Sequence, residues 1–241
     1  MAHYIYGKNT VRQYLTDGSK IEELYLQKNS RNEEFAELAR SRKIRVSFLS
    51  QEEMGKIAKG NHQGVAAAIA DYRTYTLNEV LDKIRGMDRF PLFLMLDGIE
   101  DPHNLGAILR TSDATGVDAV IIRKHRAVGL NATVAKVSSG AIDTVCVAEV
   151  ANLTDTIKTL KKEGFWICGA DNNEARDYRK ADYRVPLCLV IGSEGSGISQ
   201  LVKKNLDYSV KLPMVGKINS LNASVATAVM LYEILNQRNP V

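Results

Sequence analysis

The sequence lacks the features that would direct it into a membrane or an oxidising compartment. No run in its 241 residues approaches the roughly 18 consecutive apolar residues of a membrane-spanning helix. Residues 1–8 contain no basic segment followed by an apolar stretch, so no secretion signal is expected. The three cysteines, Cys146, Cys168 and Cys188, stand singly in apolar runs, which favours buried thiols in a reducing cytosol over disulfides or metal ligands. We therefore expect a cytoplasmic protein without a membrane partner.

The usual signatures of metal-dependent and covalent catalysis are also missing. The four histidines are far apart and lack the spacing of zinc or iron ligands. No serine lies in a nucleophile elbow with His and Asp in a recognisable order. The remaining candidate functional groups are amides, hydroxyls, backbone groups and an arginine. Such groups suit a group transfer without a covalent enzyme intermediate, which depends on positioning the reactants.

The net charge is only moderately basic, at +4 from 32 basic and 28 acidic residues, so it permits an RNA partner without requiring one. Two segments are candidates for RNA contact. Arg123, Lys124 and Arg126 follow a predicted strand, and Lys59 and His62 lie in a glycine-bounded loop whose donors suit phosphates and unpaired base edges. For both segments a plain solvated surface remains the alternative.

The apolar pattern changes along the chain and predicts two domains separated by a linker. Residues 1–72 form a small α/β unit, residues 73–89 a polar linker with one short amphipathic helix, and residues 90–241 a larger α/β domain. In the last domain, continuous apolar strands alternate with helices, which is typical of a parallel sheet covered on both faces.

The expected elements can be stated by residue range. In the first unit we predict helices over 7–15 and 32–42 and another opened by a capping box at 50–53, with strands over 23–27, 45–49 and 65–70. In the last domain we predict strands over 92–96, 119–122, 144–147, 165–170, 187–191 and 208–212, and helices over 104–114, 132–138, 153–163 and 223–236.

The most informative segments lie near the carboxyl end. An apolar run ends in Gly192-Ser193-Glu194-Gly195-Ser196-Gly197, and residues 212–214 (Leu-Pro-Met) and 219–226 (Asn-Ser-Leu-Asn-Ala-Ser-Val-Ala) follow. This is the layout of strands that deliver backbone loops to a ligand. A dinucleotide fingerprint is a poor match, because the third glycine and the ribose-binding carboxylate are missing. Glu194 would repel a phosphate, so it suits an uncharged or cationic ligand, or a structural hydrogen bond.

A second segment, residues 97–111, carries polar side chains after a strand. A proline-containing turn follows Asp97, Asn104 is expected to cap a helix, and Arg110 lies six residues later within that helix. Taken alone, these residues are a helix cap and a surface charge.

Together, the three segments resemble the SpoU, or TrmH-like, branch of the SPOUT RNA 2′-O-methyltransferases. Asn104 and Arg110 match its first motif, residues 189–197 its second and residues 212–226 its third. The N-terminal unit looks like the family's substrate-binding domain, which is similar to small RNA-binding ribosomal proteins. This layout is most similar to the RlmB branch, which methylates a guanosine ribose in the peptidyl-transferase region of 23S rRNA, whereas TrmH tRNA enzymes lack such a domain.

The resemblance implies a C-terminal trefoil knot, S-adenosyl-L-methionine as cofactor and a homodimer. It places the cofactor on Gly192, Leu212 and Leu221, with Ile191, Met214 and Asn222 nearby. It assigns Arg110 as the base, with the site arranged by Asn104, Glu194, Ser220 and Asn222. A guanidinium is rarely neutral, so Arg110 either has a strongly lowered pKa or stays charged to bind a phosphate and the developing alkoxide.

Other functions stay open. One is an adenosine-2′-O-methyltransferase of the thiostrepton-resistance type, which shares the two-domain layout. Another is a catalytically silent rRNA-binding assembly factor, disfavoured because every motif side chain is present. An NAD-dependent oxidoreductase fails on the absent fingerprint.

Overall fold

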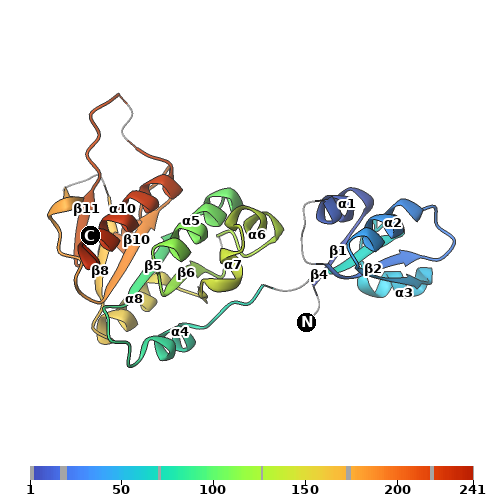
Figure 1. The fold of residues 1–241 in the computed structure, drawn as a ribbon, viewed down its shortest axis with the longest axis horizontal. Helices are drawn as coiled ribbons and strands as arrows, with labels where there is room; N and C mark the ends of the chain where they lie inside the picture. The colour runs from blue at the N-terminus through green and yellow to red at the C-terminus, as the bar shows by residue number, and fades with distance from the viewer. Residues whose placement is uncertain are drawn as a thin grey trace. The chain divides into compact units, whose positions relative to one another are not determined.

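The computed structural model divides the chain into two compact units, Met1–Tyr72 and Arg73–Val241 (Figure 1). It describes residues 3–16, 21–69, 72–125, 127–171, 175–217 and 220–240. None of the helices in these ranges combines the length and the apolar character that crossing a bilayer requires.

The first unit is a four-stranded sheet with helices on both faces. Its elements are β1 (His3–Tyr6), α1 (Lys8–Thr16), β2 (Ile21–Gln27), α2 (Glu33–Ser41), β3 (Arg45–Leu49), α3 (Gln51–Ile57) and β4 (Val65–Ile69). The strand order is β1-β4-β2-β3, with β2 and β3 parallel and the other pairs antiparallel. The amino-terminal strand β1 was not predicted, because four residues are too short for a periodicity to show.

Two separate apolar clusters hold this sheet to its helices. On one face Leu24 and Val65 pack with Val11 of α1 and Phe35 of α2, all fully buried. The other cluster joins the alanine-rich β4 to Met54 of α3. The predicted capping box is confirmed, since the Ser50 side chain accepts from the Glu53 N–H and the Glu53 carboxylate accepts from the Ser50 N–H.

The second unit contains a sheet of seven strands that pair in parallel throughout, in the order β7-β6-β5-β10-β8-β11-β9. The strands are β5 (Leu92–Asp97), β6 (Ala119–Arg123), β7 (Val147–Val150), β8 (Trp166–Ala170), β9 (Arg176–Asp177), β10 (Leu187–Gly192) and β11 (Tyr208–Lys211). Strand β10 is inserted between β5 and β8, both of which precede it in the sequence. Ligands bind where strand order reverses in this way, at the carboxyl ends of the strands. The parallel sheet is as predicted; the C-terminal knot stays a prediction.

Helices cover both faces of this sheet (Figure 1). They are α4 (Leu77–Ile84), α5 (Pro102–Ala114), α6 (Ala132–Ser138), α7 (Ala141–Thr144), α8 (Leu153–Lys162), α9 (Gln200–Lys203) and α10 (Ala223–Arg238), with a short 3₁₀ turn, η1, at Tyr178–Lys180. One buried cluster joins α4, α8 and α9 to the strands. Helices α5 and α10 pack against each other. Gly106 permits a close approach of α6 to α5, because a Cβ there would lie 2.6 Å from Cβ of Val137.

The segment predicted as a linker, residues 73–89, is instead part of the second unit. Tyr75 pairs with the edge strand β7, its N–H donating to the Val147 carbonyl at 2.8 Å and its carbonyl accepting from the Glu149 N–H at 3.0 Å. Val80 and Leu81 of α4 are buried in the main core. The polar composition was misleading because one apolar face of a short helix is enough to attach it to a sheet edge.

Two further boundaries differ from the prediction. Helix α5 begins at Pro102 with Asp101 as its N-cap, so Asn104 lies inside the first turn and does not cap. The strand predicted over 144–147 begins only at Val147, because α7 extends to Thr144 and Val145 is its C-cap. Cys168 and Cys188 are buried as expected, and burial raises the pKa of the Cys168 thiol to about 12. Cys146 is half-buried.

Candidate functional site

A cavity of about 500 Å³ opens at the carboxyl ends of β8, β10 and β11. Its wall combines the glycine loop after β10 with the segments that follow β8 and β11. The lining residues from the described ranges are Ala170, Asp171, Ile191, Gly192, Ser193, Glu194, Gly195, Ser196, Gly197, Lys203, Val210, Leu212, Met214, Ser220, Leu221, Ala223 and Ala226. Most of this wall is backbone, small side chains and aliphatic groups, and its charged residues are Asp171, Glu194 and Lys203.

The loop over residues 192–197 is a tight turn closed on itself. The Ser193 N–H donates to the Gly197 carbonyl at 3.1 Å, and the Gly197 N–H donates to the Ser193 carbonyl at 2.9 Å. A Cβ at Gly192 would lie 2.1 Å from the carbonyl carbon of Gly197, and Gly197 has a φ of +63°. Both positions therefore require glycine, whereas a Cβ at Gly195 would meet nothing within 4 Å.

Glu194 joins the three sequence segments that the resemblance singled out. Its Oε1 accepts from Nδ2 of Asn104 at 2.9 Å and from Nδ2 of Asn222. The Asn222 Nδ2 also donates to Oδ1 of Asn104 at 3.0 Å. One carboxylate thus connects α5, the glycine loop and the start of α10. These hydrogen bonds give a structural reason for a carboxylate in a glycine-rich turn.

Asn222 has a second task as the N-cap of α10. Its Oδ1 accepts from the backbone N–H of Ser224 at 2.9 Å, while the Glu194 carboxylate accepts from the Ala223 N–H at 3.4 Å. The amino end of α10 is therefore held by an amide and a carboxylate, both of which favour that end of a helix. The sequence did not assign this cap.

Arg123, predicted to contact RNA phosphates, lies beside a buried carboxylate of its own chain. Its Nη2 donates to Oδ1 of Asp97 at 3.0 Å, and the Asp97 side chain is only 4% exposed. The other oxygen of Asp97 accepts from the Ser199 N–H at 2.8 Å. This pair connects β5, β6 and the end of the glycine loop, so we assign Arg123 to the scaffold of the site rather than to RNA.

Arg110 lies on the exposed side of α5 and is not among the residues lining the cavity. The structure records no hydrogen bond or ion pair for its side chain within the described ranges. It is also not joined to Asn104, which lies six positions earlier on the helix and so on a different face. A single chain therefore assembles Asn104, Glu194 and Asn222 but leaves Arg110 apart.

The other predicted residues have clear positions. Ile191, Gly192, Leu212, Met214, Ser220 and Leu221 all line the cavity. Lys59 and Lys124 are exposed, whereas Nδ1 of the half-buried His62 accepts from the Gly64 N–H at 3.0 Å. Arg126 lies outside the described residues.

Two charged cavity residues were missed from the sequence. Asp171 and Lys203 form an ion pair in the cavity wall. The sequence indicated their positions but not their contact. Asp171 begins an irregular stretch directly after a strand, and Lys203 ends a short helix beyond the glycine loop.

Comparison with known proteins identifies the family. Residues 91–232 match the SpoU rRNA Methylase family, and residues 4–75 match the domain described as RNA 2′-O ribose methyltransferase substrate binding. The chain belongs to the SpoU rRNA methylase family. Its two matched segments correspond to the two units of the fold, and the enzyme class predicted from the sequence, an RNA 2′-O-ribose methyltransferase, is confirmed.

Relatives of similar length support this membership. A Bacillus subtilis (strain 168) protein named as a TrmH family tRNA/rRNA methyltransferase, YacO, is 42% identical over 241 residues, covering 99% of this chain and 97% of its own. A Staphylococcus aureus (strain MSSA476) protein of the same family name is 45% identical over 240 residues, covering 98% and 97%.

Solved structures show the same fold. The SpoU methyltransferase AviRb from Streptomyces viridochromogenes, in complex with AdoMet, superposes with a TM-score of 0.63 at 23% identity, covering 98% of this chain and 90% of its own. An AdoMet-bound rRNA methyltransferase from Sinorhizobium meliloti gives a TM-score of 0.65 at 25% identity, covering 97% and 86%. Both complexes agree with the predicted cofactor.

Proposed function

We propose that this SpoU-family chain transfers a methyl group from S-adenosyl-L-methionine to a ribose 2′-hydroxyl of ribosomal RNA in the cytoplasm. The observation that carries the proposal is the junction at Glu194. There the first and third motifs are joined through the second, at the rim of a cavity built from backbone and aliphatic groups.

The cavity fits the cofactor in size and chemistry. Its volume of about 500 Å³ lies within the roughly 300–1,000 Å³ of small-molecule sites. Gly192, Leu212 and Leu221 would hold the cofactor, with Ile191 and Met214 adding apolar contact. S-adenosylmethionine supplies an electrophilic methyl group on a sulfonium, and it carries no phosphate for Glu194 to repel.

The chain's own residues would prepare the acceptor. A ribose hydroxyl is a weak nucleophile at neutral pH, so it needs orientation and a group that stabilises the alkoxide as its proton passes to water, and S-adenosylhomocysteine would be the product that leaves once its methyl group is on the ribose oxygen. We assign that stabilisation to Arg110, which stays charged and pairs with a phosphate of the RNA. Asn104, Asn222 and Glu194 hold the loops in register, and Ser220 contributes a hydroxyl at the cavity.

Arg110 can reach a cavity if two chains combine, and α10 presents the surface for this. Val225, Val229 and Tyr232 are 48%, 37% and 55% exposed and recur at helical spacing on one stripe. Leu221, which lines the cavity, is 37% exposed as well. A twofold-symmetric homodimer would bury this stripe and bring a second copy to the mouth of the cavity. The partner's Arg110 then becomes the group that acts there.

We infer that the substrate is 23S rRNA and the target a guanosine of the peptidyl-transferase region. The match of residues 4–75 to a substrate-binding domain supports a large RNA. The A. aeolicus TrmH/SpoU tRNA modifying enzyme, with a TM-score of 0.58 at 31% identity, covers only 67% of this chain. An adenosine target of the thiostrepton-resistance type fits the same two-domain layout and is the second candidate.

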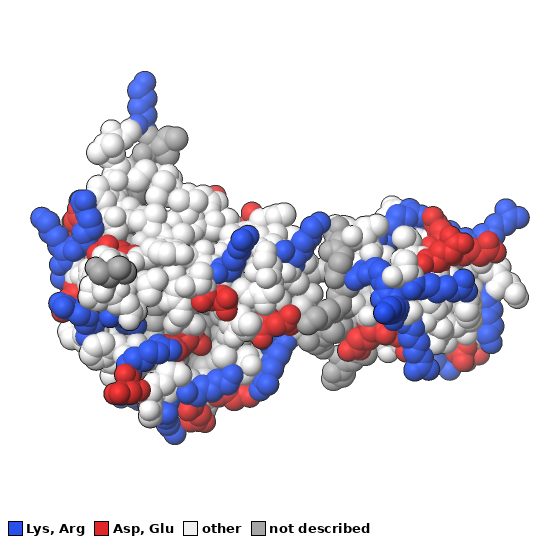
Figure 2. All heavy atoms as spheres, in the orientation of Figure 1, with Lys and Arg blue, Asp and Glu red and all other residues white. Residues whose placement is uncertain are grey.

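The candidate RNA surface is modest. Figure 2 shows Lys and Arg side chains spread over the visible face of both units and interspersed with Asp and Glu. We assign Lys59 and His62 in the first unit, and Lys124 after β6, to phosphate contact. A surface of this kind gives affinity through a few phosphate contacts, with a correspondingly moderate salt dependence.

The test is to incubate the protein with labelled S-adenosylmethionine and either unmodified 23S rRNA or total tRNA, and to map the 2′-O-methyl groups. Label on one guanosine ribose of 23S rRNA is expected. Label on an adenosine or on tRNA would reject the proposed target but not the reaction. Binding of S-adenosylhomocysteine and of rRNA without any transfer would identify a silent assembly factor.

A further inference from the structure

Two charged side chains in the wall of the cavity have no part in the motifs described above. Asp171 follows the last residue of β8, and Lys203 ends α9. They form an ion pair in which the two side chains are only 14% and 24% exposed. Among the described residues that line the cavity, the third charged one is Glu194, which is already engaged by Asn104 and Asn222.

The backbone fixes Asp171 between the two loops assigned to the cofactor. The Asp171 N–H donates to the Val210 carbonyl at 2.9 Å, next to the segment that leads to Leu212. On the other side, Ala170 pairs with Ile191, one residue before Gly192. A ligand held by both Gly192 and Leu212 therefore passes the carboxylate of Asp171.

The chemistry of the pair restricts what it can bind. An ion pair is close to neutral, so it does not attract a free phosphate. A carboxylate held by a lysine still offers several lone pairs, and neighbouring hydroxyls of a ribose are the donors that strand-end carboxylates bind in other α/β folds. Burying two charges costs solvation free energy. A ligand that hydrogen-bonds to the carboxylate would offset part of that cost.

We propose that Asp171, oriented by Lys203, binds the ribose hydroxyls of S-adenosylmethionine and is a specificity-determining residue of the cofactor site. This inference rests on the proposed function, because it requires that cofactor in this cavity. Asp171 contacts the cofactor directly, whereas Lys203 acts through Asp171 as a positioning residue.

The experiment combines substitution in the protein with deletion of atoms in the ligand. S-adenosylhomocysteine and its 2′-deoxy and 3′-deoxy analogues are titrated by calorimetry into the wild-type protein and Asp171→Asn. Loss of a hydroxyl bound by a carboxylate should weaken binding to the wild-type protein about tenfold or more. The same deletion should weaken binding to Asp171→Asn by less than about threefold, because the charged acceptor is already gone.

Lys203→Met provides a second route, with Lys203→Arg as the rescue. The methionine variant should lose most of the discrimination between S-adenosylhomocysteine and its deoxy analogues, and the arginine variant should regain it. Methylthioadenosine, which lacks the amino-acid end, should lose affinity by the same factor in the wild-type protein and in Asp171→Asn. If Asp171→Asn abolished that loss instead, the pair would bind the amino-acid end and the proposal would be wrong.

A matched ion pair at the other end of β8 gives the control. Lys161 pairs with Asp207 at 2.6 Å, and Asp207 accepts from the Ile167 N–H. Asp207→Asn should leave every ligand ratio unchanged. Equal hydroxyl losses in the wild-type protein and Asp171→Asn would overturn the inference while leaving the proposed function intact. Failure of the wild-type protein to bind S-adenosylhomocysteine would instead overturn both.

Discussion

Glu194 accepts a hydrogen bond from the Asn104 side chain at 2.9 Å, although 90 positions separate the two residues. The same carboxylate oxygen accepts from Asn222 at the start of α10. Motifs that are far apart in the sequence therefore share one acceptor in the fold. The contact makes Glu194 the residue on which the geometry of the cavity rim depends.

Replacing Glu194 by alanine should remove the acceptor that Asn104 and Asn222 share, and leave the Asn222 amide with only its bond to Oδ1 of Asn104. We expect a loss of about 1 kcal/mol in the free energy of unfolding and a fall of at least about tenfold in methyl transfer, because catalysis depends on positioning. Glu194→Gln keeps an acceptor oxygen and should lie close to wild type in a urea titration. Equal effects of both substitutions would mean that the charge, and not the hydrogen bonds, matters.

Alanine substitution at two glycines of the same loop should differ in its effect on S-adenosylhomocysteine binding. Gly192→Ala places a Cβ 2.1 Å from backbone, so the turn must open and S-adenosylhomocysteine binding should be lost. Gly195→Ala meets nothing within 4 Å and should bind normally. Calorimetric titration of both variants measures this, and normal binding by Gly192→Ala would show that this turn does not hold the cofactor.

Arg110→Ala should reduce methyl transfer by orders of magnitude and leave S-adenosylhomocysteine binding unchanged, because Arg110 does not line its own cavity. If the partner's Arg110 acts at each cavity, mixing this variant with a cavity-blocked variant such as Ala170→Phe should restore activity. Random exchange gives about a quarter of the wild-type sites. Mixtures that stay inactive, although subunit exchange is demonstrated, would place Arg110 in its own site.

The exposed stripe of α10 should control assembly. Tyr232→Glu or Val229→Glu introduces a charge into a buried apolar contact and should convert a dimer into monomers in sedimentation velocity. Leu201→Glu is the matched control, because Leu201 is 70% exposed but lies on α9, outside this stripe. Dimers that survive both α10 substitutions would locate the interface elsewhere.

Charge reversal at the candidate RNA surface should weaken RNA binding in a salt-dependent way. For each of Lys59→Glu and Lys124→Glu, the slope of log K against log salt concentration should fall by about 1. Lys158→Glu on α8 serves as the control, since Lys158 already pairs with Asp155. Cofactor binding should be unaffected in all three, and an unchanged salt slope for the first two would place the RNA footprint on other residues.

Much of the fold could be predicted because local patterns carry it. The apolar runs later seen as β5 and β10 identified buried parallel strands, and Ser50 with Glu53 identified the start of α3. The glycine spacing of residues 192–197 and the Leu212 and Leu221 segments placed the cavity correctly. Each of these signals lies within a few residues, where side-chain period and turn chemistry act.

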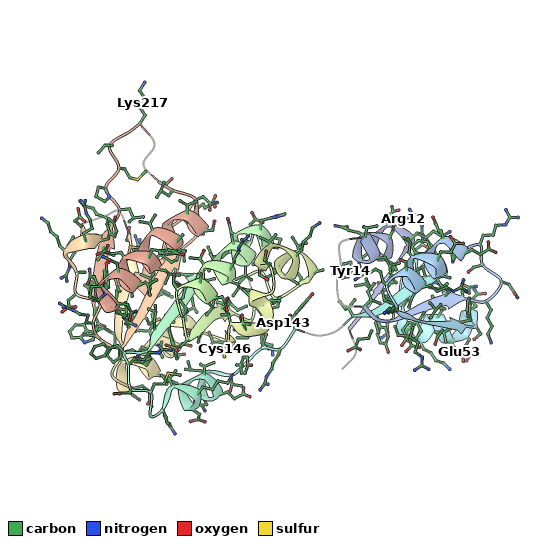
Figure 3. The ribbon with its side chains drawn as sticks, viewed as in Figure 1. Arg12, Tyr14, Glu53, Asp143, Cys146 and Lys217 are labelled. Atoms are coloured by element: carbon green, nitrogen blue, oxygen red, sulfur yellow. The ribbon has the colours of Figure 1, made fainter. Side chains whose placement is uncertain are left out.

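Figure 3 shows what such patterns could not predict. Cys146 lies beside the segment predicted as a linker, and Lys217 stands at the tip of the protruding segment after β11. The Lys83 ammonium, from that predicted linker, donates to the Cys146 sulfur at 3.1 Å. Contacts of this kind join residues 63 positions apart, so no local period reports them.

The sequence by itself determined the two-unit organisation, the parallel sheet and the backbone segments that line the cavity, because backbone propensity and apolar periodicity are local properties. Only the tertiary structure decided which polar side chains meet. Arg123, a predicted RNA contact, forms an ion pair with Asp97. Asp171 forms an ion pair with Lys203, and Glu194 accepts a hydrogen bond from Asn104. The physical reason is that a hydrogen bond depends on separation in space, which the crossing of β10 between β5 and β8 sets.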